Sequence, residues 1–411
     1  MWLSDLSPIW MANLPCYNAT PLIVGLGSSR NKVPAAIMSM NSLNAMSFHQ
    51  SSRATTPRVA PFVSSCITPA CLLLALASAP ALANAAEPAP KNVRAITVKV
   101  LVLNFDPIVD RDSGKRLHEE CRWQSPKELA RGYIDDIRQA SGGRIDYRIV
   151  EWKDLDEFPI KTDRFQYSVD EYLRCHRSGK GWHEPDGADY PRVIAQYKIA
   201  ERIERREVDE VWWFGGPYFG FFESAMAGRG AFYINGGVFG ADQVPCDRPF
   251  AIMGYNYERG VAEMLHDLCH RTESTMSRIF GGWRVEQLDN DWARFAANLK
   301  QSNGVAAVGT CHYPPNAEGD YDYANKRFVE SSADDWLQYP NLKGTKAQVN
   351  CETWGGPDYH RNYMKWWFAR LPHAPGVNAN NGRLNDWWEY VFNFQSFDNR
   401  GQPQSTTRTE R

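Results

Sequence analysis

Two histidines with the spacing of metal ligands, His266 and His270, lie in the stretch 256–280. The stretch has no proline and a single glycine near its start, so it is predicted to form a helix of about six turns. Imidazoles four residues apart on a helix can reach one metal ion, and a neighbouring carboxylate can complete the site or act as a base. Glu263 and Glu273 fall on the same face as the two histidines. This face is therefore a candidate metal or catalytic face.

The opposite side of the same helix is apolar, as a helix that faces a core requires. Its residues are Val261, Met264, Leu265, Leu268 and Ile279. A polar stripe opposite an apolar one is also what a solvated amphipathic helix shows. The sequence leaves both interpretations open, a metal or catalytic face and a solvated or structural face.

Upstream of the first strand, the chain has the pattern of a secretory signal peptide. An apolar run at 67–79 is preceded by Arg53 and Arg58 and followed by the small-residue segment PALANAA. This order predicts export and cleavage after Ala83 or Ala85, to the medium or the periplasm. The apolar run is too short to span a membrane stably, and no other stretch is long and apolar enough to do so.

A signal peptide normally stands at the start of a chain, whereas this one begins late. We therefore expect residues 1–86 to combine an over-extended start with the signal, with translation from Met38, Met40 or Met46. The alternative is a disordered N-terminal arm followed by a membrane anchor. Residues 87–399 are expected to form one globular domain, divided into the sheet and metal helix at 95–280 and a C-terminal part at 281–399. The polar residues 400–411 are expected to be a disordered tail.

Charge and cysteine content narrow the class of protein. The formal net charge is −2 and no basic patch stands out, which argues against a nucleic-acid partner. The even number of cysteines after the signal indicates disulfides in an exported chain, although a buried thiol is the alternative for Cys269. No C-x-x-C pair is present, which argues against a zinc ribbon and a thioredoxin-type site. The six cysteines are Cys121, Cys175, Cys246, Cys269, Cys311 and Cys351.

The segments around the key helix predict an α+β fold, in which helices back a small mixed sheet of three or four strands. The strands are expected from continuous or alternating apolar runs, and the helices from apolar residues at helical spacing. The expected strands are 98–105, 145–152, 210–214 and 230–237. Helices are expected to start at Ser125 as N-cap and at Asp189 or Tyr190, and to cover 289–300 and 357–371 in a helical, aromatic-rich C-terminal part.

The segment His266-Asp267-Leu268-Cys269-His270 resembles the H-E-x-x-H helix of zincin metallopeptidases, with Asp at the Glu position. The order of elements over 95–280 is also similar to that of secreted zincins, in which an edge strand precedes the metal helix. The resemblance implies a zincin-like fold, bound zinc with His266 and His270 as its first two ligands, and a peptide or protein substrate. It also implies that 230–237 is the edge strand against which the substrate pairs.

The resemblance further implies that Asp267 acts as the catalytic base. Asp is one methylene shorter than Glu, which places its carboxylate about 1.5 Å further away and can cost orders of magnitude in rate. Glu263 or Glu273 is therefore a second candidate for this role, and loss of catalysis is a third possibility.

A third metal ligand must come from elsewhere in the chain. The longer metzincin pattern requires a histidine at position 276, which is Met276 here, so that subgroup is excluded. We expect His312 as the third ligand, because its loop follows the helix and can fold back over it, with His360 as the alternative. Glu273 can either bind the metal or orient an imidazole.

Two other classes of function are compatible with the sequence. Thirteen tryptophans follow the signal, and Glu223 with Glu273 or Asp289 could act as paired carboxylates in a carbohydrate-active or carbohydrate-binding protein. The pairs Trp366-Trp367 and Trp387-Trp388 can equally be core residues.

A zincin-like scaffold without catalysis is the other class of function that the sequence allows. No G-x-S-x-G elbow and no nucleotide-binding glycine loop is present. The leading hypothesis is an exported zinc-dependent hydrolase, most simply a peptidase.

Overall fold

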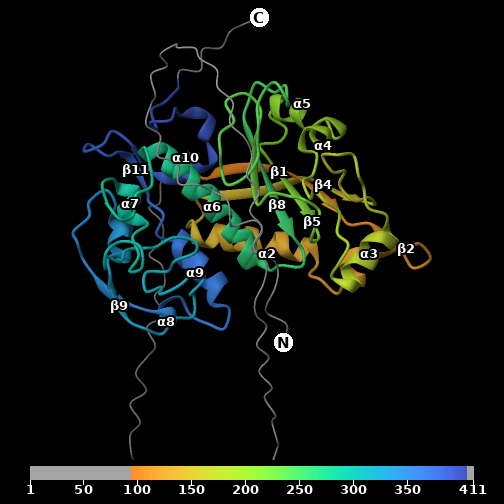
Figure 1. The fold of residues 1–411 in the computed structure, drawn as a ribbon. Helices are drawn as coiled ribbons and strands as arrows, with labels where there is room; N and C mark the ends of the chain where they lie inside the picture. The colour runs from red at the N-terminus through yellow and green to blue at the C-terminus, as the bar shows by residue number, and fades with distance from the viewer. Residues whose placement is uncertain (1–93, 405–411) are drawn as a thin grey trace, which may run out of the picture. The chain divides into compact units, whose positions relative to one another are not determined.

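The computed structural model describes residues 94–404. The expectations for 1–86 and for the end of the tail lie outside the described residues. The central feature is a six-stranded mixed sheet with the strand order β4-β1-β5-β8-β6-β7 (Figure 1). Its strands are β1 (Ile96–Phe105), β4 (Ile145–Leu155), β5 (Glu210–Gly215), β6 (Ser224–Ala227), β7 (Val238–Phe239) and β8 (Phe250–Asn256).

The sheet is parallel at its centre and becomes mixed toward one side. β1 pairs in parallel with β4 and β5, and β5 pairs in parallel with β8. β6 runs antiparallel to β8, and the short β7 lies outside β6 at the edge. The expected mixed sheet with packed helices is confirmed, although it has six strands instead of three or four.

The prediction of a strand at 230–237 was wrong. That segment is a loop, and the strands nearby are β6, β7 and β8. β8 was missed because a short apolar run directly before a helix cannot be told from the helix by periodicity alone. The consequence is that the key helix begins at Val261 and not at Asn256.

Helices cover both faces of the sheet. α2 (Pro126–Ala140), which begins at the predicted position, packs on one face together with α6 (Val261–Phe280). α3 (Val169–Ser178), α4 (Tyr190–Gln196) and α5 (Ile199–Glu204) pack on the other. Alternate residues of β1 enter the two cores, as in a strand buried on both sides. Val98, Val100 and Val102 lie in the core that contains α2 and α6. Leu101, Leu103 and Phe105 lie in the core that contains α3, α4 and α5.

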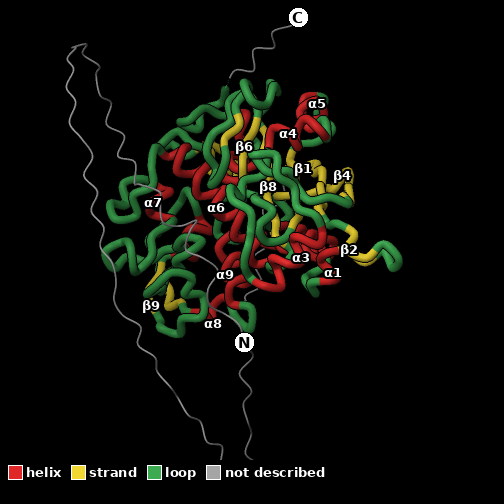
Figure 2. Tube along the Cα trace, turned by 45° about the vertical axis from the view of Figure 1, so that its right-hand side comes forward, coloured by secondary structure: helices red, strands yellow, loops and turns green. Residues whose placement is uncertain are grey.

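The second half of the described chain is mostly loop, with short helices that pack beside α6 (Figure 2). The predicted helices at 289–300 and 357–371 are present but shorter. The helices are α7 (Asp291–Phe295), α8 (Cys351–Trp354), α9 (Tyr359–Phe368) and α10 (Trp387–Phe392). Residues 400–404 are described, and Phe397 forms a β-bridge with Pro403.

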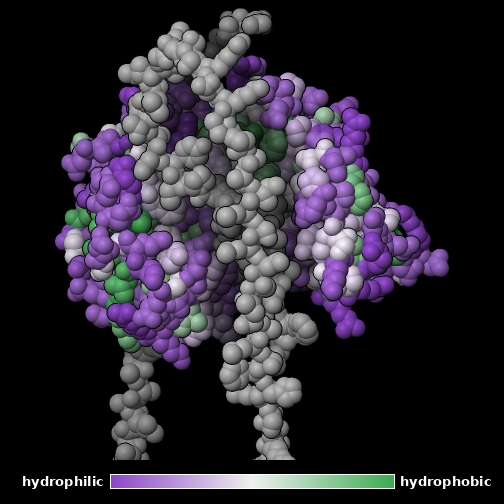
Figure 3. Space-filling view, viewed as in Figure 1, coloured by the Kyte–Doolittle hydropathy of each residue, from purple (hydrophilic) through white to green (hydrophobic). Residues whose placement is uncertain are grey.

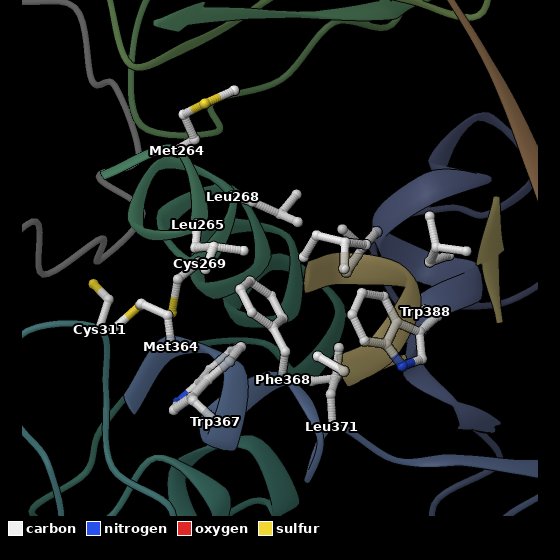
Figure 4. Packing of buried hydrophobic residues seen from close by; sticks show 14 of the residues in the cluster. Met264, Leu265, Leu268, Cys269, Cys311, Met364, Trp367, Phe368, Leu371 and Trp388 are labelled. Atoms are coloured by element: carbon white, nitrogen blue, oxygen red, sulfur yellow. The ribbon is translucent and has the colours of Figure 1, made fainter. Parts of the chain in front are cut away.

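The contact between α6 and α9 is a tightly filled part of the core (Figure 4). Leu268 of α6 and Trp367 and Phe368 of α9 are all fully buried. Truncating a leucine buried in this way typically costs about 2–5 kcal/mol, so this contact holds α9 firmly against α6. Trp366, Trp387 and Trp388 are also buried. The paired tryptophans are therefore core residues and offer no exposed face for stacking on a sugar.

The six cysteines of the described region are free thiols, so the structure gives no support for the expected disulfides. Within residues 94–404, no helix has the length and apolar character needed to cross a membrane. Described residues on the face in Figure 3 are largely hydrophilic, with small hydrophobic patches.

Candidate metal centre

Two elements bring the histidines together. α6 carries His266 and His270 one turn apart, and a loop after α7 carries His312. Side chains of α9 fix that loop, because Tyr363 Oη donates to Thr310 O at 2.8 Å and Trp367 Nε1 donates to Gly309 O at 3.0 Å. The packing of α9 on α6 thus decides where His312 lies.

Gly309 permits the turn of this loop. Its φ of +88° is the left-handed conformation that favours glycine, and a Cβ here would lie 2.4 Å from Tyr313 O. After the turn, hydrogen bonds join the backbone of Cys311 to Glu273 on α6 and to Tyr323 further along the loop. Cys311 N donates to Glu273 Oε1 at 2.9 Å, and Tyr323 Oη donates to Cys311 O at 2.6 Å.

The three Nε2 atoms of His266, His270 and His312 converge on one another. His270 Nε2 lies 3.0 Å from His266 Nε2 and 3.1 Å from His312 Nε2. In a tetrahedral site with metal–nitrogen bonds of about 2.0–2.1 Å, two ligand nitrogens are about 3.3 Å apart. The observed spacing therefore fits three ligands of one small divalent cation.

Each of the three imidazoles has a polar side chain beside its other nitrogen, a carboxylate for His270 and His312 and the His360 imidazole for His266. His270 Nδ1 lies 3.2 Å from Glu273 Oε2, His312 Nδ1 lies 3.0 Å from Asp320 Oδ1, and His266 Nδ1 lies 3.2 Å from His360 Nε2. A metal-binding histidine normally donates its second N–H in this way, which fixes the tautomer and the ring orientation. All three rings are held with Nε2 toward the common point.

The pKa values of these groups shift in different directions. Burial alone lowers the pKa of His270, but Cys311 and Glu273 outweigh it and raise that pKa well above its usual range, so a cation would have to displace a proton from this imidazole. Burial, followed by the neighbouring His270, lowers the pKa of His266 well below its usual range, and the same two causes lower the pKa of His312. Both imidazoles are neutral at pH 7, as ligation requires. Burial alone raises the pKa of Glu273, but hydrogen bonds from His270 and Cys311 outweigh it, so the pKa is lowered.

Cys311 is also close to the cluster, but on the wrong side of His270 for ligation. Its Sγ lies 3.2 Å from His270 Nδ1 and 3.6 Å from His270 Nε2. A sulfur that shared a metal with Nε2 would lie nearer to Nε2 than to the far nitrogen. Cys311 Sγ is also 3.1 Å from Glu273 Oε2. It belongs with Glu273 to the layer behind His270.

The three predicted catalytic acids occupy different places. Glu273 is buried and holds His270 Nδ1, so it orients the imidazole. Glu263 pairs with Arg259 at 2.9 Å and lies near His266 and His360. Asp267 is buried, and no described residue forms a hydrogen bond with its carboxylate. Burial, with Glu223 and Glu263 nearby, raises the pKa of Asp267 well above its usual range.

The predicted third ligand, His312, lies with His266 and His270, whereas the alternative, His360, lies behind His266. Three residues that sequence reasoning did not name also contribute, together with Glu223, which it named only as one of a pair of carboxylates. Asp320 and Tyr323 support the ligands from behind, with Tyr323 Oη 3.4 Å from His266 Nδ1. Tyr321 Oη is 3.3 Å from His312 Nε2, and Glu223 Oε2 is 3.9 Å from His270 Nε2. No spacing along the chain links these residues to the helix.

The alternative of a solvated or structural face for the polar stripe on α6 is corrected in its first part, because much of the stripe is buried. His266 is 3% exposed and Glu273 is 2% exposed, because the loop around His312 and the start of α9 cover the stripe. Buried polar groups need partners, and here the partners are other titratable side chains. Comparisons with known proteins add no assignment, since no family model, no curated protein and no solved structure matches the chain.

Proposed function

We propose that this protein is an exported zinc-dependent hydrolase with a zincin-like metal helix, and that it acts on peptides. His266, His270 and His312 are the metal ligands. The convergence of three Nε2 atoms, each ring with a polar side chain at Nδ1, is the observation that supports the proposal. Three imidazoles are a donor set of catalytic zinc sites, which keep a fourth coordination position open.

Zinc in such a site supplies Lewis acidity, which polarises a scissile carbonyl and activates water. The protein supplies the groups that handle the substrate and the protons. Tyr321 is 41% exposed and lies beside His312 Nε2, so its hydroxyl can donate a hydrogen bond to a substrate oxygen. Burial, then Asp320, raises the pKa of Tyr321 above its usual value, which keeps the hydroxyl protonated.

Metal content tests the proposal. Protein purified without added metal is assayed by elemental analysis, and hydrolysis of a quenched-fluorescent peptide library is followed with and without 1,10-phenanthroline. We expect one zinc per chain, lost in His270→Ala, and peptide hydrolysis that the chelator abolishes. His183→Ala is the matched control, because His183 lies in another loop and pairs with Asp163 at 2.7 Å.

Two results contradict the proposal. Folded wild-type protein that neither contains zinc nor takes it up would show that the three imidazoles form no metal site. If zinc binds but no peptide in the library is hydrolysed, the metal site is supported and the peptidase assignment is wrong.

A further inference from the structure

The acid that the motif offers as a base is poorly placed for that role. Asp267 is 7% exposed, and among the described residues no hydrogen bond or ion pair links its carboxylate to the three histidines. Such a base must reach water and the reacting atoms, directly or through one water molecule. Another carboxylate at this site meets that requirement better.

Glu223 approaches the same histidines from the sheet. Its Oε2 is 3.9 Å from His270 Nε2, and its side chain is 48% exposed. This separation is too long for a direct hydrogen bond. It leaves Glu223 outside the ligand set but within the distance that one bridging water can span.

The environment of Glu223 fixes its position. Asn235 Nδ2 donates a hydrogen bond to Glu223 Oε2 at 2.6 Å, and Gly254 N donates to Glu223 O at 3.1 Å. Glu223 directly precedes β6, so its backbone is tied to β8 at the point where the two strands begin to pair.

Two glycines allow this segment to pack closely. A Cβ at Gly254 would lie 2.3 Å from Phe222 O, and a Cβ at Gly236 would lie 2.1 Å from Ser224 O. The backbone on both sides of Glu223 therefore lies against glycines that no larger residue could replace without a shift. A carboxylate held on a strand in this way needs little reorganisation before reaction.

We propose that Glu223 is the catalytic carboxylate of this site, in place of the acid of the His-Asp-x-x-His motif. The inference rests on the proposed zinc-dependent hydrolysis and names the residue that moves the protons. The carboxylate thus comes from the strand side of the site, and the ligands come from the helix and the loop.

The reaction balances with water as the only co-reactant. The water oxygen forms a new C–O bond to the scissile carbonyl carbon while one water proton passes to Glu223. The C–N bond then breaks with its electron pair remaining on nitrogen, and the leaving nitrogen takes the proton from Glu223. The remaining water proton passes from the new carboxyl group to the amine, so the products are a carboxylate and an ammonium, and Glu223 is ionised again.

Glu223→Gln tests the proposal, with Glu330→Gln as a matched exposed control and Asp267→Asn as the competing variant. Three quantities are measured. Zinc content is obtained by elemental analysis, and kcat and KM are obtained on the peptide of the quenched-fluorescent library that wild type cleaves best. Binding of acetohydroxamate to cobalt-substituted protein is followed by visible absorption, which needs no substrate.

We expect Glu223→Gln to keep its zinc and to lose about 10²–10⁴-fold in kcat. KM should change by less than about threefold, because the interaction that is lost belongs to the transition state. Acetohydroxamate should bind at least about tenfold more weakly, since the carboxylate that accepts a proton from the hydroxamate is absent. Asp267→Asn should lose much less in both measurements.

Distinct outcomes overturn the inference and the proposed function. If zinc and hydroxamate binding persist in Glu223→Gln while Asp267→Asn suffers the larger losses, Asp267 is the base and the inference is wrong. If wild type binds neither zinc nor cobalt, the proposed function fails and the inference fails with it. If wild type binds metal but Glu223→Gln has wild-type hydroxamate affinity, the inference alone fails.

Discussion

Two sides of α6 bury charged or titratable groups in opposite ways. On one side, Arg271 pairs with Glu210 at 2.6 Å, and both side chains are almost fully buried. The rest of the chain contributes to this pair, since Arg271 Nη2 donates to Val391 O at 3.0 Å and Trp212 Nε1 donates to Glu210 at 2.8 Å. The chain itself supplies most of the hydrogen bonds of this pair, although Arg271 Nε has no partner among the described residues.

On the other side of the helix, three imidazoles point the same kind of nitrogen at one another. His270 Nε2 lies 3.0 Å from His266 Nε2 and 3.1 Å from His312 Nε2, with the Tyr321 hydroxyl 3.3 Å from His312 Nε2. Three such nitrogens, once unprotonated, would present converging lone pairs that a cation compensates. The difference teaches that buried polar groups indicate a functional site when the chain alone does not balance their charge or their hydrogen bonds.

Breaking the ion pair should have the largest effect on stability. Arg271→Met leaves Glu210 buried without its cation, and removing one partner of a buried pair costs about 3–5 kcal/mol. Urea unfolding of the metal-free protein measures the change, with exposed Arg327→Met as control. A loss below about 1 kcal/mol would contradict the contrast, because it would place Arg271–Glu210 in the range of surface pairs.

Removing a metal ligand should lower stability only by abolishing the stabilisation that bound zinc provides. Zinc in about 1,000-fold excess over its dissociation constant should stabilise wild type by about 4 kcal/mol against unfolding. His270→Ala should lose this increment, and the chelator should remove it from wild type. Thermal unfolding with and without zinc measures both effects. An equal stabilisation of His270→Ala by zinc would show that the ion binds elsewhere.

The groups behind the ligands should matter less than the ligands. Glu273→Gln keeps the shape of the side chain but weakens the acceptor at His270 Nδ1, so zinc affinity should fall about 10–100-fold. Competition with a chromophoric chelator measures the affinity, and Glu352→Gln serves as an exposed control. Unchanged affinity in Glu273→Gln would show that the contact does not tune His270.

Asp335 is a second buried acid, like Glu210, whose hydrogen bonds come from the chain itself. Its carboxylate accepts from Lys343 N at 3.0 Å, Gly344 N at 2.9 Å and Thr345 Oγ1 at 2.9 Å. Burial alone raises the pKa of Asp335, but these hydrogen bonds lower it overall. Its stabilisation is therefore present above the unfolded-state pKa of about 3.9 and disappears as pH falls through the lower folded-state pKa.

Asp335→Asn should accordingly cost about 1–2 kcal/mol at pH 7 and less at acidic pH. Urea unfolding of metal-free protein at pH 7 and pH 3 measures the difference, with exposed Asp242→Asn as control. A loss that does not depend on pH would show that the ionised form of Asp335 is not what the three donors stabilise.

The elements with long, regular patterns were predictable because local periodicity reflects burial. The run 98–105 is the strand β1, and the stretch that holds the two histidines is the helix α6. β8 and the edge of the sheet were not predictable, since short apolar segments have no distinctive period. The pairing of Ser224–Ala227 with β8 is a long-range contact that the segment's own residues do not specify.

The sequence by itself determined that His266 and His270 share one face of a helix, because four residues make about one helical turn. It also offered His312 as a partner, on the argument that a loop can fold back. Only the tertiary structure decided that the stripe is buried, that Glu273 faces the far nitrogen of His270, and that Glu223 arrives from the sheet. Side chains separated by tens of residues meet through packing, and packing is a property of the whole core.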